Sequence, residues 1–163
     1  MADDPIKEAL TRMPYGFYAL TSRHGDDVNA MVVNWVTQVS FTPRLVAVGL
    51  QKTCYSHGLI EKGRVFALNL FLQADADAIK PYTKGRARKP DKMANAPYTA
   101  APVTGCPILE GAAAYVECKV VSILDVGGDH DIVVGEVVGG GVSRPGEVQE
   151  TLTLPALGWS YAG

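Results

Sequence analysis

The sequence predicts a mainly β protein, built as a small closed or nearly closed barrel with a few short helices. About six or seven hydrophobic runs are rich in β-branched and aromatic residues, a composition typical of strands. These runs follow one another closely and do not alternate with long helical patterns, so they do not indicate a βαβ series. The chain has 163 residues, 47% of them hydrophobic, which suits one packed domain, and we expect residues 1–163 to form it.

The expected strands differ in how completely they are buried. Residues 44–51, RLVAVGLQ, are almost continuously hydrophobic, so we expect this strand to be buried on both faces. Residues 29–41 form one long strand with room for a bend, and its two sides differ in character. One side carries Met31, Val33, Trp35, Val39 and Phe41, and the other carries Asn34, Gln38 and Ser40. The other strands are expected at 17–22, 64–71, 111–124 and 130–143, and residues 154–163 form a last short strand or an ordered tail.

Three short helices are expected. Residues 4–12 carry hydrophobic side chains at helical spacing, and Pro5 suits a first turn. Residues 53–63 form a second helix, with Gly63 as its C-terminal stop. Residues 74–82 form a weak third helix, which Pro81 ends.

Residues 82–107 are a long excursion of different character, with four prolines and a local cluster of positive charge. Loops of this length inside a domain are usually functional or disordered. The cations either meet a phosphate or a dinucleotide, or belong to an ordinary solvated loop. They are Arg86, Arg88, Lys89 and Lys92.

Several classes of function find no support in the sequence. The formal net charge is −2, so no basic excess indicates binding to nucleic acid or to an anionic membrane. The N-terminus lacks the hydrophobic core of a signal peptide, and no hydrophobic run approaches the roughly 18 residues of a membrane span. Three cysteines without a C-x-x-C pair and three scattered histidines indicate neither a disulfide framework nor a metal site. We therefore expect a cytoplasmic protein.

The segment QKTCYSHGLI, residues 51–60, is the strongest local candidate for a binding site. A strand delivers Lys52 and Thr53 to the start of a helix, whose first turn contains Ser56 and His57. Free backbone N–H groups, a lysine and two hydroxyls would suit a phosphate group there. The alternative is that Thr53 merely caps the helix while Lys52 is solvated.

Two other features have both a functional and a structural interpretation. The polar side of residues 29–40 could hold a flat heterocycle, or it could simply meet water while Trp35 packs in the core. His130 lies between Asp129 and Asp131, ahead of a run of valines. It could bind a substrate or stabilise charge near a redox centre, or it could be a turn residue held by its acidic neighbours. No dinucleotide-binding G-x-G-x-x-G motif or P-loop follows any expected strand.

Taken together, these segments resemble the flavin reductase-like proteins of the FMN-binding split-barrel superfamily. The resemblance runs from about Leu10 to Val138 and depends on the order and spacing of several segments. They are MPYGFYALTS (13–22), NAMVVNWVTQVSFTPRLVAVGLQK (29–52), CYSHGLIEKGRVFALNLF (54–71), PDKM (90–93), TGCPILEGAAAYVECKV (104–120) and GDHDIVVGEV (128–137).

The resemblance implies an FMN-binding split β-barrel of antiparallel, Greek-key-like strands. It also implies a homodimer with one FMN per subunit near the interface, FAD being the alternative flavin. The positions that correspond to the flavin-ring wall are Asn34, Trp35, Val36 and Thr37, with Ser40 close behind. The positions that correspond to the phosphate end are Gln51, Lys52, Thr53, Ser56 and His57, and Lys92 approaches the flavin as well. Relatives place an arginine near Gln51, a departure that leaves Lys52 to supply the charge here.

The same resemblance implies an activity. The histidine of the G-D-H motif, here His130, lies beside the flavin in similar proteins and is associated with NAD(P)H binding. The implied enzyme is an NAD(P)H:flavin reductase, which transfers hydride from NADH or NADPH to flavin N5. Its reduced flavin would then serve a redox partner such as a monooxygenase or a rubredoxin. One alternative is a flavoredoxin-like electron-transfer protein that a protein partner reduces, without productive NAD(P)H binding. Another is a non-enzymatic barrel that binds a different flat ligand.

Overall fold

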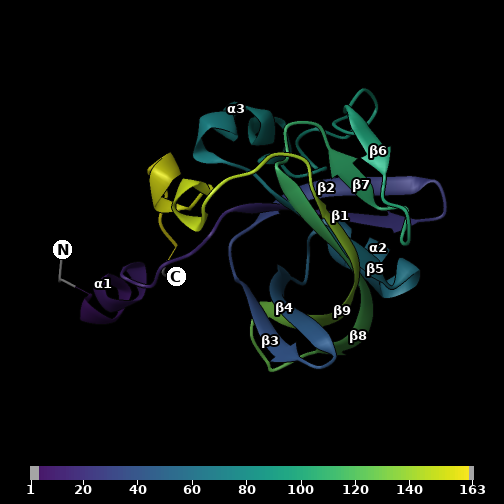
Figure 1. Cartoon of the computed structure of the whole chain (residues 1–163). Coiled ribbons are helices and arrows are strands. Elements are labelled where there is room, and N and C mark those ends of the chain that lie inside the picture. The colour runs from purple at the N-terminus through teal and green to yellow at the C-terminus, as the bar shows by residue number, and fades with distance from the viewer. Residues whose placement is uncertain (1–3, 162–163) are drawn as a thin grey trace.

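The longest predicted strand divides into two strands that lie at opposite edges of one sheet. The structure is a computed structural model that describes residues 4–161. In it, β2 spans Asp27–Val33 and β3 spans Val36–Phe41. The seven-stranded antiparallel sheet has the order β2-β1-β5-β8-β9-β4-β3. Because two strands consecutive in the chain occupy its two edges, the sheet curls into a barrel that is split beside their junction (Figure 1).

The other strands confirm the predicted mainly β class. The pair predicted at the end of the chain, β8 and β9, forms a long antiparallel ladder. A separate two-stranded sheet, β6 and β7, lies within the 82–107 excursion. The bounds of these strands are Tyr18–His24 (β1), Arg44–Gln51 (β4), Val65–Leu70 (β5), Tyr98–Ala100 (β6), Pro107–Leu109 (β7), Ala114–Leu124 (β8) and His130–Val142 (β9).

The division between β2 and β3 corrects the prediction of one strand over 29–41. Pairing of β2 with β1 ends at Val33, and pairing of β3 with β4 begins at Val36. A bulge between Gln38 and Ser40 then interrupts the alternation of side chains along β3. The predicted hydrophobic side is therefore not continuous, and Val39 and Phe41 are 52% and 88% exposed.

Strand β4 corrects a second expectation, because it is not buried on both faces. Val46, Val48 and Leu50 are buried in the barrel core, whereas the residues between them are half-buried. The other side of β4 carries only small or partly covered residues near the split. Both the buried and the half-buried side of β4 thus carry hydrophobic residues, so the periodicity of the sequence does not distinguish the two sides.

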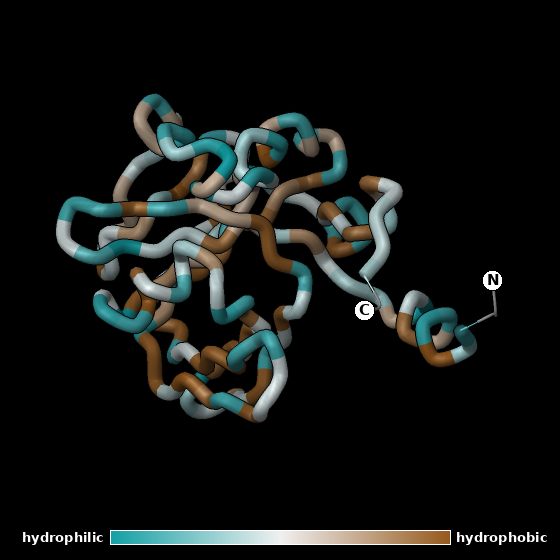
Figure 2. Tube along the Cα trace, turned by 180° about the vertical axis from the view of Figure 1, so that it is seen from behind, coloured by the Kyte–Doolittle hydropathy of each residue, from teal (hydrophilic) through white to brown (hydrophobic). Residues whose placement is uncertain are grey.

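The helices agree with prediction in place and differ in detail. Helix α1 (Pro5–Thr11) begins after Asp4, whose carboxylate accepts hydrogen bonds from two backbone N–H groups. It stands away from the barrel, and none of its side chains is buried (Figure 2). The weak helix expected at 74–82 is a 3₁₀ turn followed by α3 (Ala76–Ile79) and a second 3₁₀ turn containing Pro81. No helix in residues 4–161 is long and apolar enough to cross a membrane.

The C-terminal segment is an ordered tail in the part of the chain described. It contains a 3₁₀ turn over Pro155–Leu157 and no strand between residues 154 and 161; residues 162 and 163 of the expected segment lie outside the described residues. The Trp159 ring packs edge-on against Phe17, with 5.5 Å between ring centroids. This contact directs the tail back toward the barrel.

Helix α2 (Tyr55–Gly63) packs against β1 and β2, and its last residue makes this possible. The residue in the left-handed conformation is Arg64, with φ of 57°, and not the predicted stop Gly63. A Cβ atom on Gly63 would lie 1.9 Å from the carbonyl oxygen of Arg23. Gly63 is therefore needed for the close approach of helix and strand.

Gly63→Ala should lower the free energy of unfolding by about 1–3 kcal/mol, because the added methyl group must displace backbone. Gly58→Ala is the matched control, since nothing lies within 4 Å of a Cβ at that position of the same helix. The control should be neutral or stabilising by about 0.5–1 kcal/mol. Urea unfolding measures both, and equal stability of the two variants would contradict this packing role.

Candidate functional site

Two adjoining cavities lie at the split of the barrel. The larger has a volume of about 630 Å³ and the smaller about 240 Å³. They share Met31, Val32 and Gln51 as lining residues, so together they form one elongated site. The break between β2 and β3 bounds one end, and the start of α2 bounds the other.

The smaller cavity has aromatic and polar walls. Asn34 and Trp35, the two residues between β2 and β3, line it together with His130 and Tyr161. The rings of Trp35 and His130 meet at 61°, with centroids 4.8 Å apart. Such a wall suits one face of a flat ring.

Local backbone geometry fixes this wall. The N–H of Gly49 donates to the carbonyl of Trp35 over 2.8 Å, and a Cβ on Gly49 would lie 3.2 Å from the Trp35 side chain. His130 is the first residue of β9 and pairs with Gln51, the last residue of β4. Its Nδ1 lies 2.7 Å from the carboxylate of Asp129, and this hydrogen bond lowers the pKa of Asp129. The ends of β4 and β9 therefore hold the histidine at the cavity.

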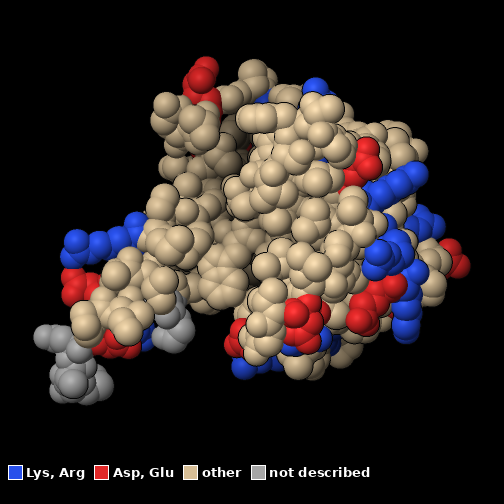
Figure 3. All heavy atoms as spheres, turned by 90° about the horizontal axis from the view of Figure 1, so that it is seen from below, with Lys and Arg blue, Asp and Glu red and all other residues tan. Residues whose placement is uncertain are grey.

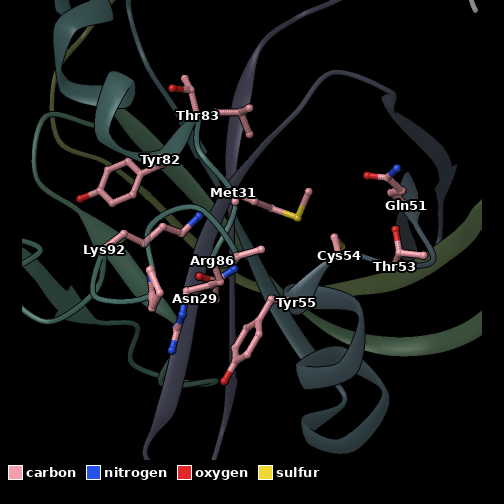
Figure 4. Close-up of a pocket in the computed structure, with 14 residues that line it drawn as sticks. Asn29, Met31, Gln51, Thr53, Cys54, Tyr55, Tyr82, Thr83, Arg86 and Lys92 are labelled. Carbon is pink, nitrogen blue, oxygen red and sulfur yellow. The ribbon is translucent and has the colours of Figure 1, made fainter.

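The larger cavity lies between the start of α2 and the loop formed by residues 83–92. Figure 4 shows Tyr82, Thr83 and Lys92 on one side of it and Gln51, Thr53 and Cys54 on the other. The loop is thus part of the site, which favours the functional interpretation of the 82–107 excursion.

Lys92 brings a buried positive charge to this cavity. The residue is 5% exposed, and its amine donates one hydrogen bond, of 2.8 Å, to the carbonyl of Lys84. Burial, with the nearby charge of Arg86, lowers the pKa of Lys92 to about 8. A desolvated ammonium group that lines a cavity favours an anionic ligand.

The start of α2 faces the same cavity without a side-chain cap. The N-cap residue is Cys54, whose side chain makes no capping hydrogen bond, so the alternative in which Thr53 caps the helix is wrong. Burial raises the pKa of the Cys54 thiol. Thr53, Cys54 and Tyr55 line the cavity at this end of the helix, where the helix dipole is positive.

Two buried amide atoms at the site have no hydrogen-bond partner. Asn29 is 2% exposed and donates from Nδ2 to the Ser56 hydroxyl over 2.8 Å, while its Oδ1 is unpaired. Asn34 likewise has an unpaired Nδ2. Buried polar atoms are nearly always paired in folded proteins. Asn29 and Asn34 line the larger and the smaller cavity respectively, and their unpaired atoms lie just beneath the cavity surface.

The structure brings together about half of the residues that the sequence singled out. Asn34, Trp35, His130, Gln51, Thr53 and Lys92 line the two cavities. On β3, Val36 packs against the barrel core, Thr37 is exposed and Ser40 lines a separate shallow hollow. Lys52, Ser56 and His57 do not line the cavities.

Sequence reasoning missed several residues that do line them. Asn29 stands at the start of the segment proposed as the ring wall, yet nothing local marks it as buried. Tyr55 and Arg86 meet across the larger cavity, with the guanidinium carbon 4.3 Å from the ring centroid. Arg86 was one of the loop cations for which both interpretations stood open, and its contact with Tyr55 depends on long-range packing.

The residues behind α2 form a charged network instead. His57 Nε2 lies 2.6 Å from Asp131 Oδ2, and both residues are buried. Lys52 Nζ lies 3.8 Å from the other oxygen of Asp131 and 2.7 Å from Asp125. The hydrogen bond with Asp125 raises the pKa of Lys52. The network ties the first turn of α2 to the start of β9, one residue from His130.

Asp131→Ala should lower the free energy of unfolding by about 1–3 kcal/mol, because it leaves the buried His57 ring without its hydrogen-bond partner. Asp125→Ala is the control: it removes the exposed partner of Lys52 and should hardly change the urea midpoint. If the two variants unfold at the same urea concentration, the buried pair does not hold α2 to β9.

Fold and site together define a split antiparallel barrel whose elongated site fits a flat ring at one end and an anion at the other. The model of the flavin reductase-like domain matches residues 10–157. The chain belongs to this family of flavoprotein oxidoreductases, as its sequence motifs indicated. Among residues 4–161, no group of three or more His, Cys, Asp or Glu side chains is arranged to hold a metal ion.

Proteins with related sequences include an NADPH-flavin oxidoreductase from Streptomyces viridifaciens. It is 32% identical over 134 residues, which cover 80% of this chain and 69% of that protein. Diflavin flavoprotein A 1 from Synechocystis is 32% identical over 143 residues, covering 87% of this chain and 25% of that protein. The chain thus spans about a quarter of the length of the diflavin flavoproteins that it matches.

Solved structures share the fold. An FMN-binding protein from Thermus thermophilus, with bound 1-cyclohex-2-enone, has a TM-score of 0.75 and 27% identity, covering 87% of this chain and 78% of that chain. An NADH:FAD oxidoreductase from Streptomyces globisporus has a TM-score of 0.76 and 24% identity, covering 90% of both chains. At that identity the second likeness concerns the fold alone.

Proposed function

We propose that residues 1–163 form one FMN-binding domain that acts as an NAD(P)H:flavin reductase. The main support for this proposal is that one elongated site has an aromatic, polar wall at one end and a buried positive charge at the other. Trp35 and His130 form an aromatic, polar wall at one end, and buried Lys92 faces an uncapped helix start at the other. A flavin mononucleotide has the same polarity, with a flat ring and a terminal phosphate.

The residues at the ring end fit an isoalloxazine. The unpaired Nδ2 of Asn34 can donate to a carbonyl or nitrogen on the ring edge. Trp35 offers a flat surface that Gly49 allows to lie close to β4. Val36, Thr37 and Ser40 would act through the backbone of β3, since their side chains do not line the cavity.

The residues at the other end fit the phosphate. Thr53 and Lys92 line the cavity beside the start of α2, and a helix N-terminus with a lysine binds phosphate in many proteins. We propose these as the phosphate contacts. Lys52, which the sequence favoured, is neutralised by Asp125 outside the cavity, and with Ser56 and His57 it would support the helix from behind.

The flavin, when bound, supplies the hydride-accepting chemistry, and the chain supplies binding and orientation. His130, at the edge of the smaller cavity, would hold the nicotinamide nucleotide, NADH or NADPH, against the exposed ring. No side chain is required as a nucleophile. The likeness to an NADPH-flavin oxidoreductase supports this activity.

We also propose a homodimer with the flavin near its interface. Val39 and Phe41 on the edge strand β3 are exposed, and Trp35 beside the smaller cavity is partly exposed. Figure 3 shows a broad region without charged side chains across the middle of the face that is seen from below, where β3 and β4 lie in Figure 1. Exposed apolar side chains on an edge strand favour association, and a second copy would cover them.

A second candidate function is electron transfer without productive NAD(P)H binding, by a domain that a protein partner reduces. The match to only a quarter of each diflavin flavoprotein favours it, because those relatives carry the domain beside others. In either case the reduced flavin would serve a partner, such as a monooxygenase or a rubredoxin-type acceptor.

Anaerobic mixing of the FMN-loaded protein with NADPH, and separately with NADH, should bleach the flavin absorbance band. His130→Ala should slow this step, measured per bound flavin at saturating FMN, by about tenfold or more, the effect of losing roughly 1.4 kcal/mol in the transition state. His24→Ala, which alters an exposed histidine on the β1–β2 hairpin, is the control and should not slow it. A flavin that only dithionite bleaches would favour the electron-transfer candidate.

Lys92→Met should weaken binding of FMN more than binding of riboflavin, because only FMN carries the phosphate. Lys52→Met is the control with the same loss of charge, and it should leave the ratio of the two affinities unchanged. In the unaltered protein the affinity for FMN relative to that for riboflavin should fall as pH rises from 7 to 9, because Lys92 loses its proton near pH 8. Flavin titration by fluorescence measures these affinities. If only Lys52→Met changes the ratio of the FMN and riboflavin affinities, Lys52 and not Lys92 contacts the phosphate.

A further inference from the structure

We propose that Tyr161, on the C-terminal tail, covers the outer side of the flavin ring, and that a nicotinamide nucleotide must displace this side chain to bind. The inference rests on the proposed function, because it concerns how the ring end of that site receives its electron donor. Tyr161 is then a specificity-determining residue, since it favours a bound flavin and opposes the nicotinamide nucleotide.

The smaller cavity is built by the barrel except at one point. The other residues that line it belong to β2, β4, β9 or the break between β2 and β3. Among residues 4–161, Tyr161 is the one tail residue that lines this cavity, and Figure 1 shows the tail in yellow, outside the strands of the barrel. Its side chain is 43% exposed, so it lies between the cavity and solvent. Tyr161 therefore closes the side of the cavity that the barrel leaves open.

The tail is attached firmly at its root and weakly at its tip. Leu152 and Leu154 are buried, and their backbone N–H groups donate to carbonyls of neighbouring segments over 2.8 and 3.1 Å. Farther along, the Trp159 ring packs edge-on against Phe17. Beyond that contact, no hydrogen bond within the described part of the chain holds Tyr161. A segment with so few contacts can open locally, so Tyr161 can leave the cavity while the root of the tail stays in place.

The volume of the smaller cavity makes Tyr161 and the nicotinamide competitors. The cavity has about 240 Å³, below the roughly 300–1,000 Å³ of pockets that hold small-molecule ligands, so it suits one flat ring and not two stacked rings. Hydride transfer requires the nicotinamide to lie against the flavin ring, and the proposed function places it beside His130, which lines the same cavity. With the flavin bound, the nucleotide therefore needs the space that Tyr161 occupies.

A tyrosine ring gives this contact a strength that a nucleotide can overcome. A contact between two aromatic rings changes a binding equilibrium by about two- to tenfold. The apparent affinity for the nucleotide falls in proportion to the fraction of molecules in which the cavity is open. The same contact thus strengthens binding of the flavin ring and weakens binding of the nucleotide, by comparable factors.

Equilibrium titrations of Tyr161→Ala beside the unaltered protein test the proposal without turnover. Riboflavin, titrated into the flavin-free protein, should bind about two- to tenfold more weakly to the variant, because the ring loses its cover. NADP⁺, and separately NAD⁺, titrated into the protein at saturating FMN, should bind about two- to tenfold more tightly to the variant. The oxidised nucleotides are the probes because they cannot reduce the flavin. Opposite changes distinguish a displaceable cover from a structural residue, whose loss would weaken both ligands.

Tyr161→Phe and Tyr98→Ala are the controls. The first keeps the ring and removes only a hydroxyl that makes no hydrogen bond in the described part of the chain, so both affinities should match those of the unaltered protein. The second removes a tyrosine of similar exposure, 39%, that lines neither cavity, and it should also change neither affinity.

Three results would overturn the proposal. Riboflavin and the nucleotides could both bind more weakly to Tyr161→Ala, which would make Tyr161 an ordinary wall of the site. Both affinities could stay unchanged, in which case Tyr161 does not cover the ring. The nucleotides could bind to neither protein at saturating FMN, which would leave Tyr161 no ligand to oppose. If riboflavin does not bind to the unaltered protein, the proposed flavin site fails and this inference with it, an outcome distinct from the other three.

Discussion

The break in the backbone ladder between Val33 and Val36 is the constraint on which the rest of the structure depends. One chain segment must leave one edge of the sheet and join the other, so the barrel cannot close there by hydrogen bonding alone. Asn34 and Trp35 lie in that gap, belong to neither strand, and turn toward the cavity. The split is therefore both the incomplete part of the fold and the wall of the site.

Two remote segments complete the site from either side of that gap. The β8–β9 ladder brings His130 to the end of β4, where it meets Trp35. The 83–92 loop brings Lys92 and Arg86 across to the start of α2. The buried His57–Asp131 pair connects these two regions, because it links the first turn of α2 to the residue after His130. Contacts between residues far apart in the sequence thus fix the positions of the two ends of the site relative to each other.

The sequence predicted the barrel class and most strands, because those features follow local patterns, and the resemblance pointed to the segments that line the two cavities. Strand propensity marks the walls, and the strand-to-helix junction at 51–57 marks a region where an anion could bind. It did not predict which side chains of that junction face the cavity. Successive residues of a helix point about 100° apart, so Ser56 and His57 turn to the barrel while Tyr55 lines the larger cavity. The bulge in β3 and the contact between Arg86 and Tyr55 depend on tertiary packing, which local patterns do not carry.

The site also explains why the barrel tolerates features that oppose its own stability. A desolvated ammonium at Lys92 and unpaired amide atoms on Asn29 and Asn34 each disfavour the folded state, and the hydrogen bond from Lys92 to the Lys84 carbonyl offsets only part of this cost. All three line the same pair of cavities. A ligand that pairs them binds the folded state and not the unfolded chain, so it must stabilise the barrel as it binds. Under the proposed function, affinity and stability are linked, because the groups proposed to bind the ligand are the same groups that the fold leaves unsatisfied.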